Sequence, residues 1–368
     1  MVNRLIAIVF ALFGYFLPSI ASTDTTATTS IHGFGLKVHS GVLQYHHKEM
    51  ALLRSKPSMA IELSYTIKSN GTRQWHKFYS YPEYGFGYIF MDLGNPEILG
   101  YSHALFPFIN IPIYSPSQRL KIGLYIGSGL GYITKTYHRT NNFKNTAISS
   151  HLNAFINLGT TLSYSLNRNF DISSSVNLMH YSNGTYKKPN SGLNYSFFSV
   201  GANYYLPYQP KIAKKPSIFP SEKHRLLALF IATQKEVKGA GGPKYPVAAL
   251  YLEYSYPLKA LWRIGVSADF MYDTSNKFIL DYQGVEWNSP WQIAKGGLML
   301  NTEFLLDRLS AIFAFGTYVY NLDSQNGIVY QRLGLRYRAS KRIFLNVSLK
   351  THWTIADYLE LGIGFKLM

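Results

Sequence analysis

The chain has 368 residues, no cysteine, 15% charged residues and a formal net charge of +17 at pH 7. The absence of cysteine excludes disulfide bonds and a lipid anchor on an N-terminal cysteine, and after the N-terminus no apolar run approaches the ~20 residues of a membrane-spanning helix. The net charge indicates an anionic partner such as a phosphorylated membrane surface, although lysines that keep loops soluble would explain it equally well.

Residues 1–21 have the features of a secretory signal peptide. Arg4 supplies the positive end, Leu5 to Leu17 the apolar segment, and Ala21 ends a small-residue cleavage site. We therefore expect an exported chain that begins near Ser22. An exported chain without a nucleic-acid-binding motif is not expected to bind nucleic acid.

The first part of the chain, residues 22–206, carries eight strand patterns after a Ser/Thr-rich lead-in. The clearest pattern sets Leu124 and Ile126 on one face against Gly123 and Gly127 on the other. The eight strands are expected at 34–45, 59–69, 83–92, 102–114, 120–132, 152–166, 172–182 and 194–206. About ten residues with one apolar face and one face of Gly, Ser, Asn and Tyr are typical of a transmembrane barrel strand.

Residues 207–222 contain four prolines with lysines between them, which is typical of a linker. Roughly eight further strand patterns follow in residues 223–368. A soluble sandwich would expose a face rich in Lys, Glu and Thr, which these patterns lack. The expected fold is therefore all-β, an outer-membrane β-barrel protein with roughly 14–16 antiparallel strands in one barrel or two.

Charged residues in the second half share the parity of the polar face. This inward set comprises Arg263, Arg332, Arg336, Arg338, Lys350, Asp269, Glu303 and Glu360. Unpaired charges in a narrow lumen are costly. We therefore expect a paired network that fills the interior.

The motif His180-Tyr-Ser182-Asn183-Gly184 lies at the end of the seventh strand pattern. His180 and Ser182 continue the lipid-facing parity of Leu178, where polar groups are costly unless they are paired. If the seventh and eighth strands pair, Asn194 joins them on one apolar wall. A base, a hydroxyl and a group that orients the base are what acyl transfer needs, so the wall suggests a lipid substrate. The alternative is a serine and a histidine that lie near lipid headgroups without chemistry.

This motif, with Pro189-Asn190-Ser191-Gly192 after it, resembles the lipid A 3-O-deacylases of the PagL type, outer-membrane enzymes that remove an ester-linked acyl chain from lipopolysaccharide. The resemblance covers roughly Phe34 to Leu206 and implies an eight-stranded barrel for that half. The second half resembles the extension of long, Bacteroidetes-like members that are labelled acyloxyacyl hydrolases.

The resemblance implies roles for individual residues. Ser182 would be the nucleophile, His180 the general base, and Asn190 would help to hold the oxyanion. We expect Asn183 and backbone N–H groups to hold the oxyanion with it. Asn194 stands where the family has an acidic residue, and it can fix the imidazole tautomer without adding charge.

The remaining expectations concern the ligands and partners of the chain. Lys187 and Lys188 would lie beside lipid A phosphates, or would belong to an ordinary solvated loop. We expect no cofactor and no metal, because no His/Asp/Glu cluster has ligand spacing. The oligomeric state stays open.

Two other functions fit the same pattern. A channel or transporter would use lumen residues such as Arg332, Arg336, Asp269 and Glu303. A structural or adhesive barrel would act through its outer loops and carry a degenerate site.

Overall fold

The computed structural model describes residues 30–45, 48–207, 224–323, 325, 327–353 and 355–368. The expected signal peptide at 1–21, the start of the lead-in and all of the linker after Pro207 lie outside the described residues. Within these ranges, no helix has the length and the apolar character to cross a membrane.

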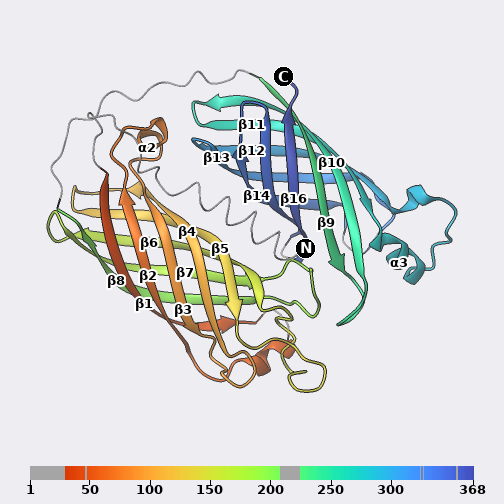
Figure 1. Cartoon of the computed structure of the whole chain (residues 1–368), viewed down its shortest axis with the longest axis horizontal. Coiled ribbons are helices and arrows are strands. Elements are labelled where there is room, and N and C mark those ends of the chain that lie inside the picture. Colours follow the sequence, from red (N-terminus) through yellow and green to blue (C-terminus); the bar gives the residue numbers. More distant parts are fainter. Residues whose placement is uncertain (1–29, 46–47, 208–223, 324, 326, 354) are drawn as a thin grey trace.

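The described residues form two closed antiparallel barrels of eight strands each (Figure 1). The first barrel consists of β1 (Ile31–Gln44), β2 (Ser58–Lys68), β3 (Glu83–Asp92), β4 (Tyr101–Tyr114), β5 (Leu120–Ile133), β6 (Leu152–Ser165), β7 (Phe170–Ser182) and β8 (Leu193–Tyr205). The second barrel consists of β9 (Arg225–Glu236), β10 (Lys244–Lys259), β11 (Trp262–Asp273), β12 (Ala294–Leu306), β13 (Leu309–Tyr320), β14 (Val329–Arg338), β15 (Ile343–His352) and β16 (Ile355–Lys366).

The pairing of the end strands decides between one barrel and two. β1 pairs with β8, from Gly33 opposite Tyr205 to Gln44 opposite Asn194. β9 pairs with β16 and closes the second barrel independently. A single barrel of sixteen strands would have been wide enough for water, whereas side chains can fill an eight-stranded lumen.

Four short helical segments lie in the connections that the structure describes. They are η1 (Lys48–Leu53), α2 (Gln74–Phe78), α3 (Ser275–Tyr282) and η2 (Pro290–Ile293). α2 follows β2, whereas α3 and η2 both follow β11.

The outer walls are apolar and the interiors are polar, as the alternation predicts. On β1, Phe34, Leu36 and Val38 are exposed, whereas Lys37 and His39 between and beyond them are buried. On β11, Val266 and Phe270 are exposed while Asp269 is buried. An apolar wall around a polar, closed interior is the construction of an outer-membrane barrel.

The lumen of the first barrel is packed around Glu62. This carboxylate lies 3.3 Å from the ammonium of Lys37 and 3.3 Å from Nε2 of His39, and it accepts a 3.1 Å bond from the Tyr125 hydroxyl. Nδ1 of His39 lies 2.6 Å from the Ser199 hydroxyl. Ser199, His39 and Glu62 thus have the order of a catalytic triad, but all three are 0–1% exposed inside the packed lumen. We interpret them as a structural network.

The lumen of the second barrel is filled by paired charges. Arg332 donates to Glu360 at 2.6 and 2.9 Å and to Asp269 at 2.9 Å. Arg336 makes a bidentate pair with Glu253 at 3.2 and 2.9 Å. The inward placement predicted from the parity is confirmed for Arg332, Arg336 and Asp269, and also for Arg263, Glu303, Lys350 and Glu360, all of which are buried. Arg338, at the end of β14, is only half-buried.

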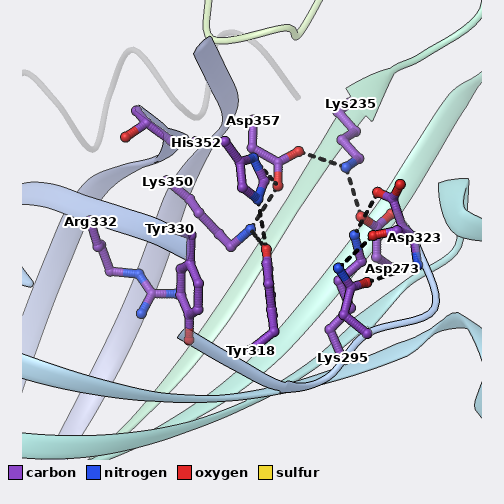
Figure 2. A network of polar contacts seen from close by, with 12 residues as sticks. Lys235, Asp273, Lys295, Tyr318, Asp323, Tyr330, Arg332, Lys350, His352 and Asp357 are labelled. Carbon is purple, nitrogen blue, oxygen red and sulfur yellow. Dashed lines mark hydrogen bonds and ion pairs between the residues drawn. The ribbon is translucent and has the colours of Figure 1, made fainter. Parts of the chain in front are cut away.

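A second layer of this network lies where β9 and β11 end (Figure 2). Lys235 lies 2.7 Å from Asp273 and 2.7 Å from Asp357. Lys350 lies 2.7 Å from Asp357 and donates to the Tyr318 hydroxyl at 2.6 Å. This layer ties β9, β11, β13, β15 and β16 together across the lumen.

Candidate active site

Ser182 is the last residue of β7, which ends where the sequence pattern predicts. Its hydroxyl accepts two hydrogen bonds, one of 2.9 Å from Nδ2 of Asn190 and one of 3.2 Å from the backbone N–H of Gly184. The residue is 7% exposed. The hydroxyl is therefore largely covered and faces two N–H donors at the end of β7.

His180 and Asn194 face each other across the β7–β8 ladder. Nδ1 of His180 lies 2.6 Å from Oδ1 of Asn194. Because a carbonyl oxygen can only accept, this bond holds the imidazole proton on Nδ1 and leaves Nε2 as the basic nitrogen. The strand pairing expected from the sequence is confirmed, and it brings His180, Ser182 and Asn194 to one end of the wall.

The loop between β7 and β8 is held by the side chain of Asn183. Its Nδ2 donates to the Ser150 hydroxyl at 2.9 Å and to the Lys187 carbonyl at 2.9 Å, while its Oδ1 accepts from the Lys187 backbone N–H at 3.3 Å. The backbone N–H of Asn183 donates to Oδ1 of Asn190 at 3.2 Å, which aims the other end of that amide at Ser182. The geometry therefore gives the Asn183 side chain a structural task, while Asn190 and Gly184 donate to the hydroxyl.

The connection between β5 and β6 supports this loop from the side. The backbone N–H of Gly192 donates to the Ala147 carbonyl at 3.0 Å, and the Ser149 hydroxyl donates to the Lys187 carbonyl at 2.7 Å. Ala147 and Ser149 are buried. Its polar composition is the signal that the sequence offers for this supporting segment.

Two glycines are required by the local geometry. Gly184 has φ +59° and Gly192 has φ +77°, a region that L-residues with a side chain rarely adopt. A Cβ on Gly192 would lie 3.0 Å from Cε1 of His180, and a Cβ on Gly184 would lie 3.3 Å from the Leu359 side chain. Gly192 therefore makes room for the imidazole, and Gly184 makes room for the neighbouring barrel.

The two lysines of the loop differ in their surroundings. Lys187 is exposed, whereas Lys188 is half-buried and donates to the Val237 carbonyl of the second barrel at 3.4 Å. Burial, followed by the nearby charge of Lys235, lowers the pKa of Lys188. Only Lys187 is thus fully presented to solvent, as a headgroup contact requires.

The chemistry that this arrangement allows follows from its parts. A hydroxyl lies among N–H donors, and a histidine with a fixed tautomer stands two residues earlier on the same face. Donors of this kind can stabilise an oxyanion, and a base of this kind can take a hydroxyl proton. Among the described residues, no three His, Cys, Asp or Glu side chains are grouped so as to hold a metal ion.

Comparison with known proteins assigns each barrel to a family model. The model "Lipid A 3-O-deacylase (PagL)" matches residues 59–203, and the model "Acyloxyacyl hydrolase, C-terminal domain" matches residues 224–368. No curated protein matches the chain.

Among solved structures, the chain is similar to Ail, the attachment invasion locus protein of Yersinia pestis, with 12% identity, 48% of this chain and 99% of that chain covered, and a TM-score of 0.25. It is also similar to an outer membrane channel from Pseudomonas putida F1, with 10% identity, 95% and 100% covered, and a TM-score of 0.19. The outer membrane protein Omp33 of Acinetobacter baumannii shares 8% identity over 92% and 99% of the two chains, with a TM-score of 0.17.

Proposed function

This chain belongs to the lipid A 3-O-deacylase (PagL) family of ester hydrolases, and we propose that Ser182 and His180 hydrolyse an acyl ester of lipid A at the outer wall of its first barrel. The substrate class and the outer membrane follow from the family and from the apolar walls. The catalytic residues are our inference from the geometry.

The reaction begins at the Ser182 hydroxyl. Nε2 of His180 takes its proton while Oγ forms a bond to the ester carbonyl carbon, and the carbonyl oxygen becomes an oxyanion. Asn190 and the Gly184 N–H, which bond Oγ in the free protein, are the donors that we assign to that oxyanion. The bond to the sugar oxygen then breaks, His180 returns the proton to that oxygen, and water hydrolyses the acyl-enzyme by the same route.

The wall beside the site suits an acyl chain. Val176, Leu178 and Phe198 lie on the outward face of β7 and β8 and are 61, 59 and 58% exposed. If the N-terminus is periplasmic, β7 runs outward and ends at the outer leaflet, where lipid A lies. Lys187 is then at the level of its phosphates.

The observation that carries the proposal is the Ser182 hydroxyl between the Asn190 and Gly184 donors, with the His180–Asn194 pair on the same wall. We expect Ser182→Ala and His180→Ala each to abolish deacylation, because residues that act as one unit fail almost equally when removed singly. Mass spectra of lipid A, taken after incubation with purified protein, measure the loss of the acyl chain.

Ser174→Ala is the matched control, since Ser174 lies on the same face of β7 and earlier in the strand. It should deacylate like the wild type. Substantial activity in a folded Ser182→Ala protein would remove Ser182 as the nucleophile.

A conductance measurement separates the enzyme from the channel alternative. The charged residues that a channel would use are engaged with one another in the second lumen, as Arg332 is with Asp269 and Glu360. We expect no steady single-channel current in planar bilayers. Large steady currents would support the channel instead.

A further inference from the structure

The loop that follows Ser182 does not end at the first barrel but contacts the second. The backbone N–H of Glu236, at the end of β9, donates to the Thr185 carbonyl at 3.0 Å. The Thr185 hydroxyl donates to the carbonyl of Asp357 on β16. Thr185 is thus bonded to both strands that close the second barrel.

These bonds fall where the closing ladder of the second barrel has ended. β9 and β16 pair from Lys366 opposite Leu227 up to Leu361 opposite Ala232. Beyond that point the two strands continue, and side chains bridge them: the Thr233 hydroxyl donates to the Leu359 carbonyl. Thr185 continues this junction of β9 and β16, which we call the seam, because its two hydrogen bonds connect the two strands.

Asp357, which accepts the hydrogen bond from the Thr185 hydroxyl, is itself held by ion pairs. The side-chain carboxylate of Asp357 lies 2.7 Å from the ammonium groups of Lys235 and Lys350 (Figure 2). Lys235 is itself tied to Asp273 on β11 at 2.7 Å. The acceptor for Thr185 is therefore anchored in the buried charge layer of the second lumen.

The contact continues on both sides of Thr185. Gly184 packs against Leu359, close enough that an added Cβ would lie 3.3 Å from its side chain. Lys244 donates to the Tyr186 carbonyl and lies 4.7 Å from the centre of the Tyr186 ring. Thr185 has φ +60°, a conformation that a β-branched residue keeps only where its surroundings hold it.

We infer that the second barrel is a positioning element of the active site: by holding Thr185, it fixes the Gly184 N–H and the turn that aims Asn190 at Ser182. This inference rests on the proposed function, because it assigns a task in the same site. Gly184 is the residue directly before Thr185, and its N–H bonds the Ser182 hydroxyl. Thr185 is thus a positioning residue that acts through Gly184.

The test replaces the Thr185 hydroxyl in the full-length protein in detergent or liposomes. Thr185→Val keeps the branched shape and loses the bond to Asp357, whereas Thr185→Ser keeps the hydroxyl. We expect Thr185→Val to lower kcat for lipid A deacylation by roughly 10- to 100-fold with KM little changed, since small misplacements at a reacting centre have effects of that size. Thr185→Ser should stay near the wild type.

A second readout does not depend on activity. Hydrogen exchange of the peptide that covers residues 183–190 should become faster in Thr185→Val and stay unchanged in Thr185→Ser. A wild type without deacylation would refute the proposed function. The exchange data would still test whether the Thr185 hydroxyl stabilises the loop. Unchanged exchange and unchanged kcat in Thr185→Val would overturn the inference.

Control variants exclude general damage. Thr274→Val removes a hydroxyl that donates to the Pro246 carbonyl at 2.7 Å, in the connection that follows β11. It should keep wild-type kcat and loop exchange, and an equal loss in Thr274→Val would overturn the specific role of Thr185. If Thr185→Val does not fold, Lys244→Met provides the test: a several-fold lower kcat and faster loop exchange support the inference, and no change in either overturns it.

Discussion

The hydrogen bond between Asn194 and His180 fixes which imidazole nitrogen can act as a base. Asn194→Ala removes the 2.6 Å contact while leaving Ser182 and its donors in place. We expect kcat to fall on the order of tenfold to a hundredfold, less than in Ser182→Ala, because Asn194 orients and does not react. Steady-state deacylation rates of the two variants measure this difference.

Asn194→Asp is the informative companion because it is nearly isosteric with asparagine. A carboxylate at that position would stabilise the imidazolium that forms in the transition state. The rate should be equal to or higher than that of the wild type at neutral pH. If Asn194→Ala and Asn194→Asp both behave like the wild type, another residue orients His180.

Gly192 should be sensitive to the smallest side chain. In Gly192→Ala the new methyl group would lie 3.0 Å from Cε1 of His180, and the alanine would have to adopt φ +77°. We expect the imidazole to move and kcat to fall roughly 10- to 100-fold. Gly241→Ala is the matched control, since Gly241 has φ +80° and open space around its Cβ position. Equal loss in both variants would mean that backbone strain alone is responsible.

The residues of the site differ in how far sequence could predict them. His180 and Asn194 face each other because strand side chains alternate and one polar loop joins the two strands, and both facts are local. The contact of Thr185 with Asp357 joins residues 172 positions apart, so no local pattern could indicate it. The Gly184 donor is a backbone group, and its direction depends on φ rather than on residue type.

At the scale of elements, the alternation of apolar and polar residues predicted the strand bounds closely. The strand expected at 120–132 is β5, Leu120–Ile133, and the strand expected to end at 182 is β7, Phe170–Ser182. Closure could not be predicted in the same way. Alternation says which face of a strand is apolar, but not whether β1 pairs with β8 or with the last strand of the chain.

The connection that contains α2 should respond to acid. His76 is buried in α2 and accepts a hydrogen bond from the Gly71 backbone N–H at 3.2 Å through Nδ1. Burial, followed by the charge of Arg73, lowers the pKa of His76 to about 4. In the unfolded chain an unperturbed histidine titrates near 6.5, so the unfolded state binds the proton first as the pH falls. The free energy of unfolding should therefore decrease, by about 3 kcal/mol at most, between pH 6.5 and 4.

Unfolding by denaturant at a series of pH values measures this effect. His76→Gln removes the titrating group and should lack this part of the pH dependence. An identical pH profile in wild type and His76→Gln would show that the protonation of His76 does not control the stability of this connection.

At the scale of the whole molecule, two sets of contacts join the barrels at opposite ends of the first. The β7–β8 loop contacts β9 and β16, as described for Thr185. At the other end, on either side of α2, the Tyr79 hydroxyl donates to the Leu305 carbonyl at 3.1 Å, and Arg73 pairs with Asp307 at 3.0 Å. The Arg73–Asp307 pair is exposed and contributes little by itself.

The charge network of the second lumen should matter for stability and not for chemistry. Arg336→Met removes one of the two arginine partners of Glu253, which keeps the 2.7 Å bond from Arg225, and leaves a buried carboxylate with less compensation. Breaking a buried pair in this way costs roughly 3–5 kcal/mol, so we expect a lower Tm. Deacylation by the folded fraction should stay near that of the wild type, because Arg336 lies away from the seam layer that holds Thr185.

Temperature-resolved electrophoresis of folded and unfolded forms gives the Tm, and lipid A mass spectra give the activity. Asp269→Asn, which weakens the pair with Arg332 at 2.9 Å, should behave similarly. A variant with wild-type Tm would show that the buried pairs contribute nothing net. A variant with normal Tm and lost activity would connect the lumen to catalysis directly.

The incomplete ladder between β9 and β16 has a consequence for assembly. These strands are the first and the last of the second barrel, so their pairing is its most non-local contact and we expect it to form late. Beyond the paired part of this ladder, the Glu236 N–H and the Asp357 carbonyl form hydrogen bonds to Thr185, which lies in the β7–β8 loop of the first barrel. We therefore expect the C-terminal barrel to finish closing only after the N-terminal barrel has folded and presents Thr185.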